Sequence, residues 1–331
     1  MKAVIMAGGY ATRLWPITKS KAKPLLPLGS KRIIDHIYEK VIDLEIPVII
    51  STNKRFEEDF REWSRGKKVE IIVENTKSEE EKLGAVRALA EIARGLNEDI
   101  LVLAGDNVFS FSLKELYCYF LEKKKPVIGL YDVNDLDLAK RYGVAEMEKE
   151  RVIRFHEKPE KPPSTLIGIG VYFLPKKSID LLLEYVEKSK RSDNLGDFIG
   201  YLCEKEEVYG MKFNGSWYDV GNADSYIEAF KSFTNHYVDR SVEIEKSAKI
   251  IEPVVIERGA KITGRSIIGP YAFIGSECKI ESSDVSESIV FSGTVLQRVK
   301  LWRSIIDERC EIRSIQLTNS IIGGNAKIQG G

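Results

Sequence analysis

The first 29 residues, MKAVIMAGGYATRLWPITKSKAKPLLPLG (1–29), combine a short apolar segment with a glycine pair and two cations. The apolar segment before Gly8 and Gly9 is typical of a strand buried on both faces, and Arg13 and Lys23 follow the glycines. Glycines let backbone N–H groups approach a phosphate closely, and cations neutralise it. A tight turn with solvated cations is the alternative interpretation, and neither the GxxxxGK[ST] nor the GxGxxG spacing is present.

The residues that follow alternate short apolar segments with amphipathic ones. Segments such as PVIIST (47–52) and DILVLAGD (99–106) predict strands, whereas EEEKLGAVRALAEIARGL (79–96) has apolar residues at helical spacing. This order predicts an α/β fold, with a Rossmann-like, mostly parallel sheet flanked by helices. Such sheets bind ligands at the carboxyl ends of their strands, where the glycine pair and Asp106 are expected.

The hydrophobic period changes near residue 237. From there, isoleucines recur every six residues. This spacing is typical of a β-helix coil, in which side chains stack inward, whereas ordinary β-sandwich strands are the alternative. The spacing jumps by ten to Val290 and again to Ile322, which predicts loops that leave the coil. We therefore predict an α/β domain over 1–236 and a β-helix domain over 237–331. The isoleucines at six-residue spacing are Ile244, Ile250, Ile256, Ile262, Ile268, Ile274 and Ile280.

The composition argues against several classes of protein. Fifty basic residues balance fifty acidic ones, so no overall positive field would attract nucleic acid or an anionic membrane. No apolar segment reaches the length of a membrane span, and the N-terminal one is too short for a signal peptide. The four cysteines are far apart without a CxxC pair, which argues against structural zinc and disulfides. We expect a cytoplasmic protein with neither nucleic-acid nor membrane partners.

Five segments resemble the motifs of one enzyme family in the family's order. GGYATRLWPITKSKAKPLLPLG (8–29) is similar to the G-G-x-G-T-R-L-x-P-x-T and K-P-L-x-P motifs of the sugar-1-phosphate nucleotidyltransferases. The six-residue repeat is similar to the left-handed β-helix of many members. The resemblance covers about 1–230 and implies a Rossmann-like catalytic domain before a left-handed β-helix. The other matching segments are LVLAGDN (101–107), RYGVAEMEKERVIRFHEKPEKPPS (141–164), GIGVYFL (168–174) and WYDVGNADSYIEA (217–229).

The resemblance implies a reaction in which a nucleoside triphosphate and a hexose-1-phosphate give a nucleoside-diphosphate sugar and pyrophosphate. Asp106 and Asp219 would hold Mg²⁺, a hard cation that prefers oxygen ligands. Three basic residues would have catalytic roles: Arg13 at the phosphates around the α-phosphorus, Lys23 at the sugar phosphate or transition state, and Lys158 at the sugar-1-phosphate. No general base is expected, because a sugar phosphate is already ionised at neutral pH.

Further contacts are implied by the same motifs. His156 precedes Glu157, and we interpret it as a hydrogen-bonded or solvent-facing histidine at a strand end rather than a catalytic one. The nucleotide-binding residues implied are Gly8, Gly9, Thr12, Arg13, Leu83, Gly84 and Asp106. The sugar-phosphate-binding residues implied are Lys23, Gly143, Glu157, Lys158 and Gly170.

The sequence departs from the family pattern at three places. Ala11 replaces the usual glycine of G-x-G-T-R, which adds a methyl group where backbone meets phosphate. LGAVRAL (83–89) replaces L-G-T-A-G-A-L and puts Arg87 near the nucleotide site. Thr165 follows Ser164 where many members have asparagine. The second and third departures concern base and sugar recognition.

The motifs leave the substrates and some functions open. GDNVF (105–109) and RYGVAEM (141–147) favour glucose-1-phosphate with dTTP or UTP, whereas GGYATRL (8–14) and the tail favour mannose-1-phosphate guanylyltransferases. A non-catalytic subunit of the same fold is another alternative, although such relatives typically lose the basic residues or an aspartate that are present here.

A β-helix can also house an acyltransferase, which commonly uses a histidine base. Here all three histidines, His36, His156 and His236, precede the coil. We therefore expect the tail to be an oligomerisation or regulatory module, and the protein to be a homo-oligomer.

Overall fold

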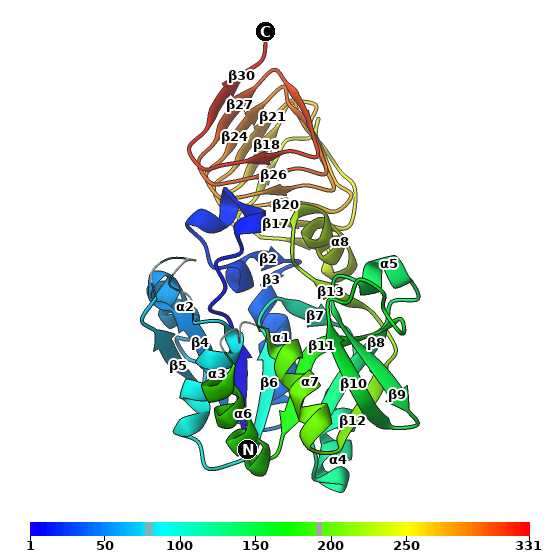
Figure 1. Cartoon of the computed structure of the whole chain (residues 1–331). Helices are drawn as coiled ribbons and strands as arrows, with labels where there is room; N and C mark the ends of the chain where they lie inside the picture. The colour runs from blue at the N-terminus through cyan, green and yellow to red at the C-terminus, as the bar shows by residue number, and fades with distance from the viewer. Residues whose placement is uncertain (77, 79–80, 82, 190–193) are drawn as a thin grey trace. The chain divides into compact units, whose positions relative to one another are not determined.

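The computed structural model describes residues 1–331 except 77, 79–80, 82 and 190–193 (Figure 1). The described part divides into two compact units, which we call the α/β unit and the coil unit. The α/β unit comprises Met1–Gly9 and Ile34–Trp217, and the coil unit comprises Tyr10–Ile33 and Tyr218–Gly331. Residues 10–33, which carry all of the first family motif except Gly8 and Gly9, therefore group with the β-helix. The predicted domain boundary between 236 and 237 stays a prediction.

The α/β unit is built on one large sheet. Its order is β5-β4-β1-β6-β11-β8-β12-β10-β9. The strands from β5 to β6 are parallel to one another, as the alternating sequence pattern predicts, whereas β11 runs antiparallel to β6 and the sheet is mixed beyond it. The bounds are β1 (Lys2–Met6), β4 (Val48–Asn53), β5 (Val69–Glu74), β6 (Ile100–Ala104), β8 (Val127–Asp132), β9 (Gly143–Glu148), β10 (Arg151–Glu157), β11 (Leu166–Leu174) and β12 (Val208–Phe213).

Both faces of this sheet are covered. Successive residues of a strand point to opposite faces, and Ala3, Val4 and Ile5 of β1 are all fully buried. Residues of α3, α6 and α7 share one apolar core with the strands. In the described part of the chain, no helix is both long and apolar enough to cross a membrane. The helices are α1 (Ile33–Ile42), α2 (Glu57–Trp63), α3 (Ala85–Arg94), α4 (Lys114–Lys123), α5 (Leu136–Ala139), α6 (Lys176–Lys188), α7 (Leu195–Lys205) and α8 (Ala223–Phe233).

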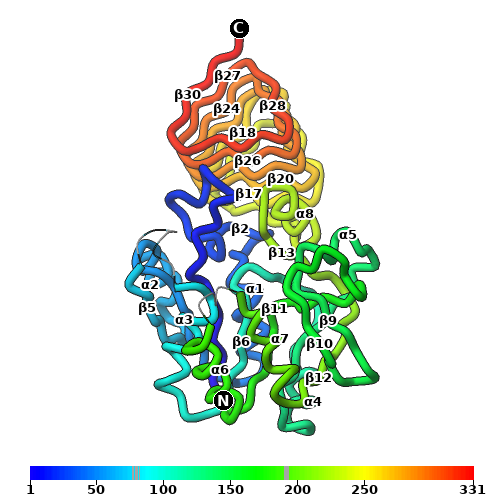
Figure 2. Tube along the Cα trace, in the orientation of Figure 1, coloured from blue at the N-terminus to red at the C-terminus, as the bar shows by residue number. Residues whose placement is uncertain are grey.

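The coil unit contains the predicted β-helix. In residues 237–331, all of which are described, successive turns of the coil build three sheets of parallel strands, and the last turn contributes to the first two of them (Figure 2). The first sheet holds β14 (Tyr237–Val238), β17 (Val254–Ile256), β20 (Ala272–Ile274), β23 (Ile289–Val290), β26 (Ile305–Ile306) and β29 (Ile321–Ile322). The second holds β15 (Glu243–Ile244), β18 (Lys261–Thr263), β21 (Lys279–Glu281), β24 (Val295–Gln297), β27 (Glu311–Arg313) and β30 (Lys327–Gln329). The third holds β16 (Lys249–Ile250), β19 (Ile267–Ile268), β22 (Asp284–Ser286), β25 (Lys300–Trp302) and β28 (Gln316–Thr318).

The stacking rows follow the six-residue spacing only at first. Ile256 pairs with Ile274, eighteen residues on, but Ile274 pairs with Val290, sixteen residues on. The jumps of ten residues are therefore two sides of five residues each, and the prediction of loops that leave the coil is wrong. Ser282 and Glu287 adopt left-handed backbone at the corners of these shorter sides, which lets the chain turn tightly.

Other elements of the coil unit pack beside the β-helix. Residues 10–33 contain η1 (Thr12–Leu14), η2 (Ile17–Lys19), η3 (Lys23–Leu25), β2 (Pro27–Leu28) and β3 (Lys31–Arg32). The Tyr226 hydroxyl of α8 donates to the Pro27 carbonyl at 2.7 Å, and Phe230 of α8 lies edge-on to Phe273 of the coil. Residues 10–33, α8 and the first turns of the coil therefore share one folded unit.

Candidate active site

The two glycines after β1 differ in their surroundings: Gly8 is closely packed, whereas Gly9 has free space around it. Asn53 donates its side-chain amide to the Gly8 carbonyl at 2.9 Å. A Cβ atom at Gly8 would lie 2.8 Å from the Glu74 carboxylate, whereas one at Gly9 would have no atom within 4 Å. Gly9 is also exposed. The backbone at Gly9 is therefore held by its neighbour and left accessible, which suits close approach of a ligand.

Asn53 and Glu74 are site residues that the sequence reasoning missed. They are the last residues of β4 and β5, so they lie at the same carboxyl edge of the sheet as the glycines. Burial raises the pKa of Glu74. The Ser51 hydroxyl donates a hydrogen bond to the Glu74 carboxylate at 3.2 Å, which partly opposes that rise. Their position at the carboxyl ends of adjacent parallel strands is the signal that could have found them.

Asp106 lies at this edge too, directly after β6. The Gly105 N–H donates to the Met6 carbonyl at 2.9 Å, which places Asp106 beside the end of β1. Asn107 donates its side-chain amide to the Asp106 carboxylate at 2.9 Å, and the Trp217 indole N–H donates to the Asn107 side-chain oxygen at 2.9 Å. These two linked hydrogen bonds, from Trp217 to Asn107 and from Asn107 to Asp106, orient the Asp106 carboxylate.

Leu83 and Gly84 precede α3 instead of lying within it. The predicted helix over 79–96 begins at Ala85 in the structure, and residues 79–80 and 82 lie outside the described residues. Gly84 has a φ of 84°, a conformation that favours glycine. The Arg87 guanidinium, which the motif comparison put near the nucleotide site, donates to the Ser189 carbonyl at 3.2 Å.

Glu157 is the last residue of β10, in the mixed part of the sheet. Two glycines, Gly143 and Gly196, leave room for its carboxylate, and we call them the glycine cradle. Gly143 of β9 is its register partner, and a Cβ atom there would lie 3.1 Å from the Glu157 carboxylate. A Cβ atom at Gly196 of α7 would overlap the same carboxylate. Burial raises the pKa of Glu157, and the Asp197 charge raises it further while Lys158 lowers it. Gly196 was missed by the sequence reasoning, although a glycine inside a helix often marks a close approach.

Gly170 shows a second close approach on the same sheet. Its φ is 70°, and a Cβ atom there would lie 2.7 Å from the Cβ of Ala104 on β6. Ala104 comes two residues before Asp106. The side chain absent at Gly170 therefore lets β11 approach the strand that leads to Asp106.

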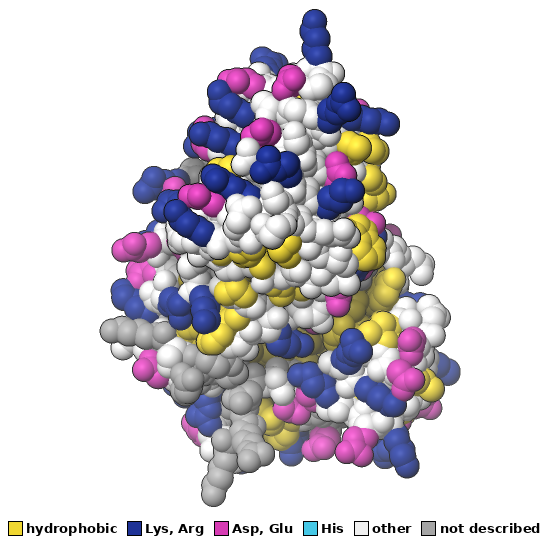
Figure 3. All heavy atoms as spheres, turned by 90° about the horizontal axis from the view of Figure 1, so that it is seen from above, with side chains coloured by type: hydrophobic (Ala, Val, Ile, Leu, Met, Phe, Trp, Pro, Cys, Tyr) yellow, Lys and Arg dark blue, Asp and Glu magenta, His cyan; other side chains and the backbone are white. Residues whose placement is uncertain are grey.

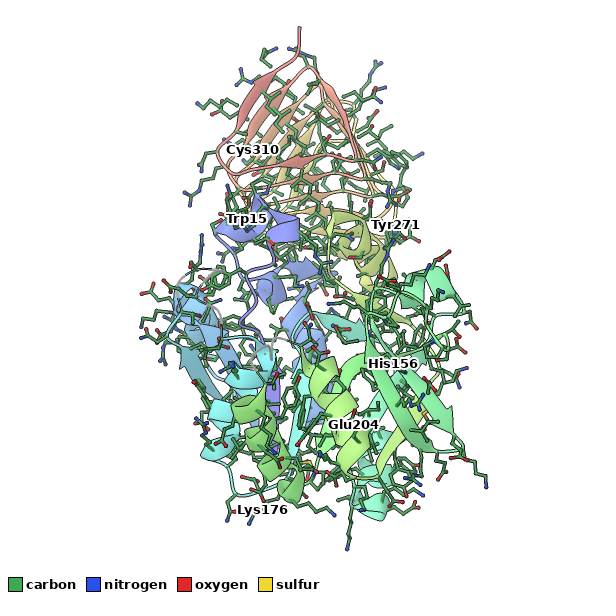
Figure 4. All side chains as sticks on the ribbon, viewed as in Figure 1. Trp15, His156, Lys176, Glu204, Tyr271 and Cys310 are labelled. Carbon is green, nitrogen blue, oxygen red and sulfur yellow. The ribbon has the colours of Figure 1, made fainter. Side chains whose placement is uncertain are left out.

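Lys158 has an unusual backbone for a lysine. Its φ is 45°, in the left-handed region, and its N–H donates to the Tyr142 carbonyl at 3.0 Å. The ammonium lies 3.3 Å from the Glu157 carboxylate, with the side chain 55% exposed. Backbone strain in a non-glycine residue can accompany function, although Lys124 and Lys149 adopt the same conformation. His156, labelled in Figure 4, has its ring nitrogen 2.6 Å from the Glu146 carboxylate, in agreement with its interpretation as a hydrogen-bonded histidine.

Two of the predicted residues of the coil unit, Arg13 and Asp219, lie close to Gly221. A Cβ atom at Gly221 would lie 3.3 Å from the Asp219 carboxylate and 3.5 Å from the Arg13 guanidinium. Lys23 is only 9% exposed, whereas Thr12 and Arg13 are exposed. The structure thus brings Arg13 and Asp219 together in the coil unit, and it brings Gly143, Glu157 and Lys158 together in the α/β unit.

Ala11, the departure from the family glycine, has left-handed backbone with φ 50° and ψ 46°. Its carbonyl accepts from the Thr18 hydroxyl at 2.8 Å and from the Leu14 N–H at 2.9 Å, which fix this conformation. Left-handed backbone costs a non-glycine residue about 1–2 kcal/mol, which explains why glycine is usual here.

We expect Ala11→Gly to stabilise the protein slightly. Relief of the left-handed strain, less the greater chain entropy of glycine, gives a net gain of about 0.5–1 kcal/mol, or a rise in Tm of about 2 °C. Thermal unfolding followed by circular dichroism measures it. Ala22→Gly is the contrast, because Ala22 is buried with a φ of −65°, so that variant should unfold at a lower temperature. Equal losses in both variants would contradict the strain argument.

A sequence model of one family matches most of the chain. The family is described as "Nucleotidyl transferase", and the match covers residues 2–236. The chain belongs to the nucleotidyl transferase family. Membership confirms the family that the motifs predicted, and the Rossmann-like core followed by a β-helix confirms the predicted fold class.

Individual relatives carry related names. The chain is 30% identical to the bifunctional protein GlmU of Methanococcus maripaludis strain C7, over 79% of this chain and 62% of that protein. It is 27% identical to a glucose-1-phosphate thymidylyltransferase of Streptomyces antibioticus, over 98% of this chain and 96% of that protein. A crystal structure of a Bacillus anthracis protein assigned as a glucose-1-phosphate thymidylyltransferase superposes with a TM-score of 0.63 at 26% identity, over 72% of this chain and 98% of that one. The match thus spans less than two thirds of the Methanococcus protein's own length.

Proposed function

We propose that this nucleotidyl transferase family member makes a nucleoside-diphosphate sugar from a nucleoside triphosphate and a hexose-1-phosphate. The preferred substrates are glucose-1-phosphate with dTTP or UTP, and GTP with mannose-1-phosphate is the alternative. The observation that carries the proposal is the glycine cradle that holds Glu157 beside the strained Lys158, because it falls on the family motif at which a sugar phosphate is expected. The similarity to the Streptomyces thymidylyltransferase over nearly the whole chain supports the pyrimidine preference.

The proposed step exchanges one phosphorus–oxygen bond for another. An ionised oxygen of the sugar phosphate forms a bond to the α-phosphorus, and the bond from that phosphorus to the bridging oxygen breaks, so that pyrophosphate leaves with the electron pair. The protein mainly aligns and neutralises two polyanions. Arg13 and Lys23 would bind phosphate oxygens, Lys158 would bind the sugar phosphate, and Glu157 would accept hydrogen bonds from sugar hydroxyls. The nucleotide would lie against Gly9.

The residues present fit a divalent cation that is shared with the substrate. In the described part of the chain, no group of three or more His, Cys, Asp or Glu residues could hold a metal by itself. We propose that Asp106 and Asp219 supply carboxylate ligands and that triphosphate oxygens complete the set, which suits Mg²⁺. The cation would neutralise charge on the phosphates. Asp106 is already oriented by Asn107, as a ligand should be.

The proposal extends to assembly and to the tail. We propose a homo-oligomer in the cytoplasm with small molecules as its ligands. On the face shown in Figure 3, basic and acidic side chains are interspersed, in line with the balanced composition. The Methanococcus relative is named bifunctional, but the coil of this chain contains no histidine, so we propose no acyl transfer.

The first experiment measures pyrophosphate release with Mg²⁺, crossing dTTP, UTP, GTP, ATP and CTP with the 1-phosphates of glucose, mannose, galactose and N-acetylglucosamine. One strong pair with dTTP or UTP is expected. A strong pair with GTP and mannose-1-phosphate would establish the alternative. No release from a folded, metal-loaded sample would favour a non-catalytic subunit and overturn the proposal.

We expect Gly9→Ala to lower kcat/KM for the nucleotide by about tenfold while the Tm stays within about 1 °C, because the added methyl group would meet only the ligand. Gly8→Ala is the matched comparison, since its methyl group would press on Glu74 and lower the Tm as well. Steady-state kinetics and thermal unfolding of both variants test this. An unchanged nucleotide KM and kcat in Gly9→Ala would remove Gly9 from the nucleotide site.

A further inference from the structure

We propose that the β-helix holds the phosphate-binding segment 10–33 in place, and that Asp307 is the positioning residue through which it does so. The inference rests on the proposed roles of Arg13 and Lys23 in phosphate binding. It assigns to the coil a part in the transfer reaction itself, in addition to any role in assembly. All the groups involved belong to the coil unit.

The central contact is a largely buried ion pair between the segment and the coil. The Lys21 ammonium lies 2.8 Å from the Asp307 carboxylate and 3.3 Å from the Glu308 carboxylate. The Asp307 side chain is 5% exposed and the Lys21 side chain 20% exposed. The ammonium also lies 5.4 Å from the centre of the Phe291 ring of the preceding turn of the coil. A charge removed from water to this extent depends on its partner, so the pair fixes the position of Lys21.

The coil side of this contact is rigid. The Asp307 N–H donates to the Ile322 carbonyl on the next turn at 3.0 Å, and its carboxylate accepts from the Glu308 N–H at 2.8 Å. A Cβ atom at Gly324 would lie 3.2 Å from the other carboxylate oxygen. Asp307 is therefore held by its own turn and by the following one, and it presents one oxygen to Lys21.

A second contact lies at the other end of the same stretch. A Cβ atom at Gly323 would lie 3.0 Å from the Pro16 ring, so the glycine lets the segment pack directly on the coil. Figure 4 shows the neighbouring Trp15 beside the coil. Arg13 stands three residues before Pro16, and Lys23 stands two residues after Lys21. The two contacts thus lie within the stretch between the two proposed phosphate ligands, close to each of them in sequence.

The coil also holds the helix that follows Asp219. The Arg303 guanidinium lies 2.6 Å from the Glu228 carboxylate and 3.3 Å from the Asp224 carboxylate, both on α8. Lys231 of α8 lies 2.9 Å from Glu287 of the coil. The β-helix therefore anchors both chain segments that carry the proposed phosphate and metal ligands of this unit.

Such anchoring has a direct consequence for catalysis. A short segment that binds phosphates must otherwise be ordered when substrate binds, and that ordering lowers affinity and rate. Because the coil fixes Lys21 and Pro16 beforehand, Arg13 and Lys23 are preorganised. Loss of the Asp307 charge should loosen residues 10–33 selectively and leave the coil folded.

The test compares Asp307→Asn and Lys21→Met with Asp284→Asn in the full-length protein. Asp284 is a half-buried coil aspartate whose carboxylate lies 3.9 Å from the Lys300 ammonium. We expect hydrogen exchange of residues 10–33 to quicken about tenfold in the first two variants and to stay unchanged in Asp284→Asn. We also expect kcat/KM to fall about tenfold for both substrates, and the reversed pair K21D/D307K to recover part of it.

Each outcome decides the proposal. Exchange in 10–33 that is unchanged in both Asp307→Asn and Lys21→Met would overturn it, and so would equal quickening throughout the coil. If wild-type protein shows no turnover with any substrate pair, the proposed function fails, but the exchange experiment still decides whether Asp307 positions the segment. If Asp307→Asn does not fold, Lys21→Met, which leaves the coil intact, decides alone.

Discussion

Asp219→Asn is expected to lower Mg²⁺-dependent pyrophosphate release by about 10²- to 10³-fold, the loss usual when one preorganised group at a transferring phosphoryl centre is removed. The asparagine keeps the shape of the side chain and removes the negative charge that would attract both the cation and the Arg13 guanidinium. A Cβ atom at Gly221 would lie within 3.5 Å of both the Asp219 carboxylate and the Arg13 guanidinium, so the substitution removes a charge close to Arg13. The segment that follows is held by the capping box of Asn222 and Ser225 at the start of α8.

The controls separate the metal from the fold. Asp284→Asn removes a coil carboxylate outside the site and should leave turnover unchanged. Mn²⁺ binding in the presence of nucleotide, followed by water relaxation, should weaken about tenfold in Asp219→Asn, because one of two carboxylate ligands is neutral. EDTA should stop the wild-type reaction and Mg²⁺ should restore it. Full activity and unchanged Mn²⁺ binding in Asp219→Asn would show that the metal site lies elsewhere.

The sequence pattern predicts the coil well up to Ile280 and less well afterwards. The inward rows at Ile256, Ile262 and Ile268 are fully buried, as six-residue spacing requires, although Ile244 at the start of the coil is 40% exposed. From Ile280 on, a turn of the coil has sixteen residues instead of eighteen, because two of its sides have five residues instead of six. When only the isoleucines at six-residue spacing are followed, two such sides appear as a jump of ten residues, which was wrongly interpreted as a loop. Val285 and Leu301 continue the stacking at the shorter spacing.

The α/β sheet shows a similar limit. The parallel strands were predictable because amphipathic segments alternate with the short apolar runs. The antiparallel insertion of β11 next to β6 was not, because it depends on which distant segments pair and not on local periodicity.

The candidate-site residues that lie in family motifs could be predicted from the sequence. Those that only the packing of distant segments brings close were missed. Gly143, Glu157 and Lys158 were expected from one motif, and the structure brings them together. Gly196 is 39 residues from Glu157 in sequence, so its closeness depends on how α7 packs against β10. Asn53 donates to Gly8 from the end of the neighbouring strand, so its position at a strand end was a signal in the sequence, but the contact itself depends on which strands are adjacent. The grouping of residues 10–33 with the coil was likewise beyond the sequence, because it depends on contacts with residues some three hundred positions later.

Lys158→Met is expected to lower kcat/KM for the sugar phosphate by about 10²-fold, because a charge-assisted contact to phosphate is lost at the reacting end of the substrate. The Tm should change little. The ammonium is exposed and its contact with Glu157 is partly screened by water, so the pair contributes little to stability. Lys161→Met, three residues on in the same exposed segment, is the matched control and should keep wild-type kinetics.

A third variant separates the side chain from the backbone at this position. Lys158→Gly should be as inactive as Lys158→Met but more stable than it by about 1 kcal/mol, because glycine adopts the left-handed backbone without strain. Steady-state kinetics with thermal unfolding measures both effects. Kinetics that remain normal in Lys158→Met would remove the lysine from the sugar-phosphate site. Equal stability of Lys158→Gly and Lys158→Met would show that the backbone there stores no strain, and the geometric reason for assigning a function to Lys158 would be lost.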